Sequence, residues 1–294
     1  MKPPYLLPWK KRTYVMGIIN LTPDSFSGDG LLARVDPVQA AVEQALQFID
    51  AGADILDLGG ESTRPGHNPV SAEEELARIL PVVKELVRLD LQVPISVDTY
   101  KAGVADAALQ AGAHWVNDVW GLTADPDMGA VVAQRHAAVV LMHNASRPKA
   151  AVQSASLGGR YTGEETEDII ALVKRGLEEC LQRAVRAGIP SEHILLDPGI
   201  GFGKTIRQNL ELINRLDELA SLGFPLLLGP SRKSFIGYTL NLPYDQRLEG
   251  TLAAVAIGVA RGADVVRVHD VRAAVQVVRM ADAIVGKNLP AEAA

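Results

Sequence analysis

Short apolar runs alternate with amphipathic helical patterns along the whole chain. One phrase, a helical pattern followed by a glycine and a run rich in Val, Ile or Leu, recurs in "DAGADILDLGG", "QAGAHWVNDV", "RAGIPSEHILLD", "SLGFPLLLG" and "ARGADVVRVH". The glycines stand where a helix ends in a left-handed residue, and they are Gly52, Gly112, Gly188, Gly223 and Gly262. The runs that follow are too short for helices and are typical of strands buried on both faces.

Counting these units predicts eight strands, at 13–20, 54–59, 94–98, 115–119, 138–143, 194–197, 225–229 and 265–269. A helical pattern follows each of them. Helix starts are visible at "SAEE" (Ser71 to Glu74) and "TGEE" (Thr162 to Glu165), which both fit capping boxes. Eight alternating β/α units favour a (β/α)8 TIM barrel of the α/β class, and a doubly wound open sheet is the alternative.

No linker or low-complexity segment divides the chain, so we expect one domain over residues 1–294. Residues 1–12 are predicted to be a short N-terminal extension, and residues 287–294 a frayed tail. Residues 145–162 are expected to form the one long loop.

Composition narrows the function classes. The chain is 48% hydrophobic with a net charge of −6, so no general basic field favours nucleic acid or an anionic membrane. Its single cysteine, Cys180, excludes an intramolecular disulfide and a multi-cysteine metal site. The start "MKPPYLLPWKKR" does not fit a signal peptide, and no stretch approaches the roughly 20 apolar residues of a membrane span. We therefore expect a cytoplasmic protein.

Polar residues collect at the C-terminal ends of the predicted strands and not at their starts. They are Asn20, Asp98, Asn117, Asp118, His143, Asn144, Asp197, Ser231, Arg232, Lys233, Arg267 and His269. Each has a structural explanation by itself, such as a helix cap at Asp98 or a turn at Asp197. Together they lie on the face where barrel enzymes build active sites, so the pattern indicates an enzyme.

Two nucleotide-binding motifs are excluded at "PGIGFGKT". A phosphate-binding loop GxxxxGKT requires glycine at position 198, which is Pro198, and the glycines at 199, 201 and 203 do not fit GxGxxG. No group of His, Asp and Glu residues has metal-ligand spacing, so a protein-caged zinc is not expected.

Cations at the rim of an acidic protein indicate an anionic substrate, most simply a phosphate or pyrophosphate. They are Arg64, Lys233, Arg267 and His269. If magnesium is used, it needs only one weak protein ligand besides phosphate oxygens, and Asn20 is the candidate.

The acidic residues predict a second kind of recognition. A buried carboxylate such as Asp98 or Asp197, with Asn117 beside it, can accept the two parallel hydrogen bonds of a guanine or pterin ring. Arg267 could stack its planar guanidinium on such a ring while its charge faces the phosphate.

The residues resemble the dihydropteroate synthase family. The resemblance rests on "NLTPDSFSGDG" (20–30), "DLGGESTRPG" (57–66), "SVDT" (96–99), "ND" (117–118), "DPGIGFGK" (197–204), "GPSRKSFIG" (229–237) and "RVHD" (267–270), in order over nearly the whole chain. It implies a transferase of folate synthesis and a sulfonamide target. The implied reaction condenses 6-hydroxymethyl-7,8-dihydropterin pyrophosphate with p-aminobenzoate to give 7,8-dihydropteroate and pyrophosphate.

The resemblance also implies residue roles. The pterin would be held by Asp98, Asn117, Met142, Asp197, Lys233 and Arg267. The pyrophosphate would be held by Asn20, Thr63, Arg64, Arg267 and His269, with Asn20 as the Mg²⁺ ligand. The p-aminobenzoate would be held by Arg64, Pro65, Phe202, Ser231 and Lys233. Asp98, Lys233 and Arg267 would be catalytic.

One stretch departs from the family, because "LMHNASRP" (141–148) stands where many members have Met-Gln-Gly after "LMH". The alternative function is a pterin-binding methyltransferase module that passes a methyl group from methyltetrahydrofolate to a corrinoid. Such a module does not bind a pyrophosphate, so the cations of "TRPG", "SRK" and "RVH" argue against it. A non-enzymatic pterin-binding protein is a further alternative. The family also suggests a homodimer through helices far from the rim.

Overall fold

The computed structural model describes residues 6–22, 36–62, 69–146, 151–154 and 156–287. Eight parallel strands form one sheet in the order β8-β5-β4-β3-β2-β1-β10-β9, and Leu226, next to β9, pairs with Leu196 of β8. The sheet therefore closes on itself as a (β/α)8 barrel, which confirms the predicted fold and rules out the open sheet. The strands are β1 (Tyr14–Asn20), β2 (Ile55–Gly59), β3 (Ile95–Asp98), β4 (Trp115–Asp118), β5 (Ala138–Met142), β8 (Ile194–Asp197), β9 (Leu227–Leu228) and β10 (Val265–Val268).

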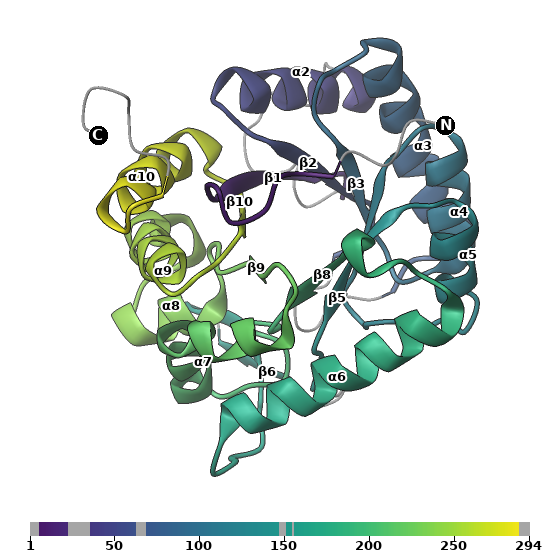
Figure 1. Ribbon diagram of the computed structural model, residues 1–294. Helices are drawn as coiled ribbons and strands as arrows, with labels where there is room; N and C mark the ends of the chain where they lie inside the picture. Colours follow the sequence, from purple (N-terminus) through teal and green to yellow (C-terminus); the bar gives the residue numbers. More distant parts are fainter. Residues whose placement is uncertain (1–5, 23–35, 63–68, 147–150, 155, 288–294) are drawn as a thin grey trace.

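Helices surround the strands on all sides (Figure 1). The α-helices are α2 (Pro37–Asp50), α3 (Ala72–Arg88), α4 (Ala102–Gln110), α5 (Met128–Gln134), α6 (Ile169–Ala187), α7 (Ile206–Asn214), α8 (Ser234–Leu240), α9 (Leu248–Ala260) and α10 (Val271–Ile284). Short 3-10 helices are η1 (Ser191–His193), η2 (Leu216–Leu222) and η3 (Tyr244–Gln246). None of the helices in the described ranges combines the length and apolarity of a membrane span.

The helix ends follow the local sequence rules, with one exception. All five glycines predicted to end helices have positive φ angles. Ser71 caps α3 by accepting the Glu74 N–H, which is one half of the predicted capping box, whereas the Glu74 carboxylate pairs with Arg78. The predicted capping box at Thr162 is wrong, because α6 begins at Ile169 and is capped by Asp168. The side chain of Asp168 satisfies the N–H groups of the first turn, so the helix needs no earlier cap.

The expected long loop at 145–162 is partly structured, and this prediction is corrected. It contains an antiparallel hairpin of β6 (Ala151–Ser154) and β7 (Gly158–Tyr161). The Arg247 guanidinium donates to the Leu157 carbonyl at the hairpin turn, at 2.8 Å, and the Tyr161 ring stacks on Phe202. These contacts lie 90 and 41 residues away along the chain, so local sequence does not reveal them.

Candidate active site

The alternation of side chains along each strand places the predicted residues inside the barrel. Trp115 and Val265 belong to a buried apolar cluster that also contains inward-facing residues of the neighbouring strands. Successive side chains of a strand point to opposite faces, so residues two positions further along point the same way. Asn117 and Arg267 therefore lie in the next layer up, towards the C-terminal ends of the strands, and Asp197 follows the same rule on β8. The lower barrel is filled by apolar groups, and the upper layer is polar.

Arg267 is the centre of this polar layer. Its Nε lies 2.6 Å from Asp57 Oδ2, and one terminal nitrogen lies 2.6 Å from Asp98 Oδ2. Asn117 donates to the same Asp57 oxygen at 3.3 Å. Burial raises the pKa of Asp98 to about 7, and Asp57 and Glu75 add to this effect, while Arg267 and Lys233 oppose it. One guanidinium thus compensates two buried carboxylates.

Asp57 is the functional candidate that the sequence analysis missed. It lies inside β2, is fully buried, and interrupts the apolar run "ILDLG". The signal was available, because Asp57 stands two residues after Ile55, an inward-facing member of the barrel core. Its Oδ1 is buried without a hydrogen-bond partner among the described residues. A carboxylate in this position has a role other than filling the core.

Asp197 and Lys233 form a second pair of charged groups at the rim. Asp197 Oδ1 accepts the Gly199 N–H at 2.7 Å. Lys233 donates to the Ile200 carbonyl, and its ammonium lies 4.7 Å from the centre of the Phe202 ring. Burial raises the pKa of Asp197 and lowers the pKa of Lys233 to about 8, and in each case the other group's charge acts in the opposite direction.

Ser231, His269 and Asn20 meet at the rim next to β10. Ser231 Oγ lies 2.9 Å from His269 Nδ1 and also accepts the His269 backbone N–H at 3.1 Å. The Asn20 amide nitrogen lies 3.5 Å from His269 Nε2. The imidazole of His269, at the end of β10, therefore contacts both the connection after β9 and the end of β1.

The glycines of "PGIGFGK" serve close packing between connections. A Cβ at Gly199 would clash with the His143 carbonyl, and one at Gly203 would clash with the backbone of Ala145; both glycines have positive φ. Lys204 is buried and donates to the carbonyls of His143, Gly199 and Phe202 at 3.2, 2.8 and 3.1 Å. Burial lowers its pKa to about 7. This lysine holds the connection after β5 against the connection after β8.

The structure brings together all of the predicted site residues that it describes. Met142 is the last residue of β5, buried opposite Asp197 in the strand register. Three predicted residues, Thr63, Arg64 and Pro65, lie outside the described residues. In the described part of the departing stretch "LMHNASRP", residues 141–146, Asn144 donates to the Val119 carbonyl and accepts the Ser146 N–H.

Comparison with known proteins agrees with this geometry. The pterin-binding enzyme family model matches residues 16–269. The dihydropteroate synthase of Bacillus subtilis is 45% identical over 285 residues, which cover 97% of this chain and 93% of that protein. The solved structure of a Clostridium difficile dihydropteroate synthase in the presence of pteroic acid has a TM-score of 0.84 and 45% identity, with 95% and 98% of the two chains covered. A Xanthomonas albilineans dihydropteroate synthase in complex with 7,8-dihydropteroate has a TM-score of 0.80 and 39% identity, with 95% of each chain covered.

Proposed function

The chain belongs to the pterin-binding enzyme family and is a dihydropteroate synthase, and we propose that the residues gathered at its strand ends carry this reaction. The substrates are 6-hydroxymethyl-7,8-dihydropterin pyrophosphate and p-aminobenzoate, and the products are 7,8-dihydropteroate and pyrophosphate. The observation that carries the assignment of residues is the convergence of Asp98, Asn117 and Asp197 with Arg267 and Lys233 in one polar layer.

The carboxylates and the amide form the pterin site. Asp197 Oδ1 is bonded to Gly199, so we assign its other oxygen, Oδ2, to the ring edge of the pterin. We assign Asp98 and Asn117 to the side of the pterin site across from Asp197. Asp98 is held there by its contact with Arg267, and Asn117 by its contact with Asp57. Met142 provides an apolar wall. Asp57 joins this set, because its charge fixes both Arg267 and Asn117.

The pyrophosphate is assigned to Arg267, His269 and Asn20, with Thr63 and Arg64 added from the family motif.

The described residues can supply Mg²⁺ with one protein ligand. No group of three or more His, Cys, Asp or Glu side chains in the described part of the chain could hold a metal. Asn20 offers one amide oxygen at the rim beside His269, which suits an ion held mainly by phosphate oxygens and water. Bound there, Mg²⁺ would neutralise charge on the departing pyrophosphate.

Bond changes are simple in this reaction. The bond between the pterin methylene carbon and the pyrophosphate oxygen breaks, and the amine nitrogen of p-aminobenzoate bonds to that carbon and loses a proton. Arg267 and His269 favour departure of the anion, and the negative charge of Asp98 stabilises the positive charge left on the pterin. Asp98 and Arg267 are catalytic in this proposal because they act on these charges, and Lys233 is assigned as the third catalytic residue from the family motif.

The second substrate is assigned to the rim next to the pterin. Ser231, the stem of Lys233 and the ring of Phe202 lie together there, and the Tyr161 ring stacks on Phe202 from the β6–β7 hairpin. Arg64 and Pro65 complete this site in the family motif. An aromatic ring bound against Phe202 would direct its amine towards the pterin methylene.

We also propose a homodimer in the cytoplasm. Helices α9 and α10 pack together, and the exposed apolar side chains on and just after them are Ile257, Met280, Ile284 and Val285. Such apolar exposure is typical of a protein interface. Sedimentation of the wild type and of Met280→Glu tests the dimer, and cell fractionation tests the location.

The function is tested by measuring pyrophosphate release with both substrates and with each one alone. Release that requires both, together with formation of 7,8-dihydropteroate, supports the proposal. Methyl transfer from methyltetrahydrofolate with no pyrophosphate release would favour the methyltransferase alternative. Binding of pterin without turnover would favour a non-enzymatic role.

A further inference from the structure

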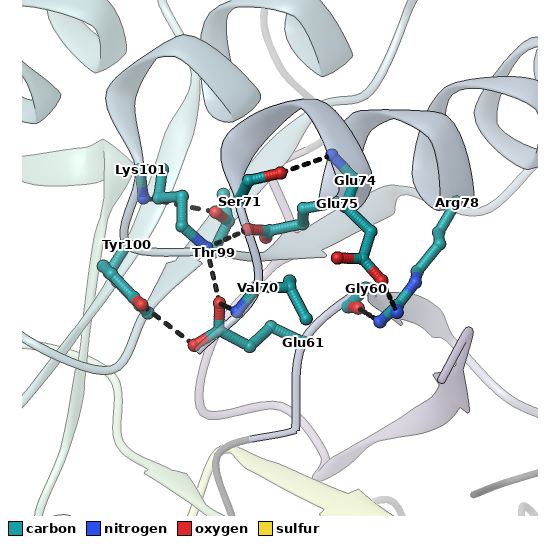
Figure 2. Close-up of polar contacts among 10 residues, drawn as sticks. All are labelled: Gly60, Glu61, Val70, Ser71, Glu74, Glu75, Arg78, Thr99, Tyr100 and Lys101. Atoms are coloured by element: carbon teal, nitrogen blue, oxygen red, sulfur yellow. Dashed lines mark hydrogen bonds and ion pairs between the residues drawn. The ribbon is translucent and has the colours of Figure 1, made fainter. Parts of the chain in front are cut away.

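A cluster of three charged side chains lies beside the site and takes no part in the roles above. Figure 2 shows Lys101 pointing between Glu61 and Glu75, with its Nζ 2.5 Å from a carboxylate oxygen of each. The lysine side chain is 17% exposed, Glu61 is 10% exposed and Glu75 is 1% exposed. One ammonium group therefore compensates two nearly buried carboxylates.

Glu61 joins two ends of one connection. It follows β2, and its Oε2 accepts the N–H of Val70, which stands just before the α3 cap, at 3.2 Å. Its Oε1 accepts the Tyr100 hydroxyl at 2.9 Å, from the connection after β3 (Figure 2). One carboxylate therefore holds three described segments together: the residue after β2, the residue before the α3 cap, and the connection after β3.

Glu75 connects the same lysine to the wall of the pterin site. It lies in the first turn of α3 behind Gly60, where an added Cβ would come within 2.9 Å of Glu75 Cγ. The adjacent Gly59 faces Asp98, with its own Cβ position 3.8 Å from that of Asp98. The second oxygen of Glu75, Oε1, is buried with no hydrogen-bond partner among the described residues. Without Lys101, this carboxylate would be a buried charge with no compensating cation bonded to it.

We propose that Lys101 is a positioning residue for the synthase reaction, because it clamps Glu61 and Glu75 and so fixes the backbone from Gly59 to Glu61. This inference rests on the proposed function, in which Arg64 and Pro65 hold p-aminobenzoate. Arg64 and Pro65 follow Glu61 by three and four residues in the sequence. Among the assigned pterin residues, Asp98 adjoins the clamped backbone at Gly59, whereas Asn117, Asp197 and Arg267 lie on other strands. We therefore expect the clamp to act on the second substrate more than on the pterin.

The experiment compares Lys101→Met with Lys101→Arg, using Arg88→Met as the matched control. Arg88 lies in the last turn of α3 in an exposed ion pair with Glu85, at 67% and 35% exposure, whereas Glu75 lies in the first turn of that helix. We expect Lys101→Met to raise the KM for p-aminobenzoate roughly 10- to 100-fold, as for a small displacement of a positioned group. Pterin affinity by calorimetry should stay within about twofold of the wild type. Lys101→Arg should recover most of the KM, since a guanidinium also bridges two carboxylates, and Arg88→Met should match the wild type.

A second variant keeps the proposal testable if Lys101→Met does not fold. Glu61→Gln preserves the shape of the more exposed partner and should raise the same KM. The proposal is overturned if folded Lys101→Met or Glu61→Gln leaves the KM for p-aminobenzoate unchanged. It is also overturned if pterin affinity falls as much as the KM rises, or if Lys101→Arg does not recover. Failure of the proposed function is distinct, because then the wild type itself would not release pyrophosphate.

Discussion

Replacing Arg267 with methionine tests the electrostatics of the polar layer directly. Arg267 contacts Asp57, which is 0% exposed, and Asp98, which is 8% exposed, at 2.6 Å each. Methionine retains much of the length and volume but removes the cation. Removal of one partner from a buried ion pair costs about 3–5 kcal/mol, because the remaining charge stays buried. We expect a loss of stability in that range above pH 8.

The stability lost on replacing Arg267 should increase with pH. Burial raises the pKa of Asp98 to about 7, although Arg267 lowers it. The unfolded value is about 3.9, so between these values the folded protein binds a proton that the unfolded chain does not. The contribution of Asp98 to the stability of the wild type therefore falls as the pH rises towards 7 and then levels off. Without Arg267 the pKa of Asp98 rises further, and the variant should continue to lose about 1.4 kcal/mol per pH unit above pH 7.

Urea unfolding at several values from pH 6 to pH 9 measures this difference. Asp57→Asn combined with Arg267→Met is the control, since removal of both charges should restore part of the stability and give a coupling energy of about 0.5–3 kcal/mol. Parallel pH curves for the wild type and Arg267→Met would refute the reasoning. They would mean that Arg267 does not compensate Asp98 in the folded protein.

Three further predictions concern other groups at the rim. Asp197→Asn should weaken pterin binding by about 2–4 kcal/mol, since it places a donor against ring donors, and unchanged affinity by calorimetry would exclude Asp197 from the pocket. His269→Ala should weaken binding of pterin pyrophosphate but not of the pterin alone, and equal weakening of both ligands would contradict its assignment to the anion. Burial, and secondarily Lys204, lowers the pKa of His143 to about 3, so the neutral ring supports a stability that is lost as pH falls below about 6.5. In urea unfolding, the wild type should lose about 2 kcal/mol of unfolding free energy between pH 7 and pH 5, and His143→Gln should not show this loss. If the unfolding free energy of both proteins falls equally with acid, the histidine is excluded as the cause.

Much of the architecture could be predicted from the sequence, because it follows from local rules. Apolar runs of strand length, five of them preceded by a helical pattern ending in glycine, predicted eight strands that lie within a few residues of the observed ones. The polar residues at the strand ends were predicted to converge, and Asn117, Asp197 and Arg267 do so. The two-residue alternation of a strand and the closure of parallel strands at one rim are sufficient for that result.

Only the tertiary structure decided which charges meet. Arg267 contacts Asp57 across 210 positions of the sequence, and Lys101 joins Glu61 of the connection after β2 to Glu75 of helix α3. Neither pairing has a local signature, because it depends on strand register and barrel closure. The same reason applies to the contacts that the β6–β7 hairpin makes with Arg247 and Phe202. Local sequence determines where a strand or helix begins and ends, whereas the partner of a buried charge depends on how the closed barrel arranges all of its strands.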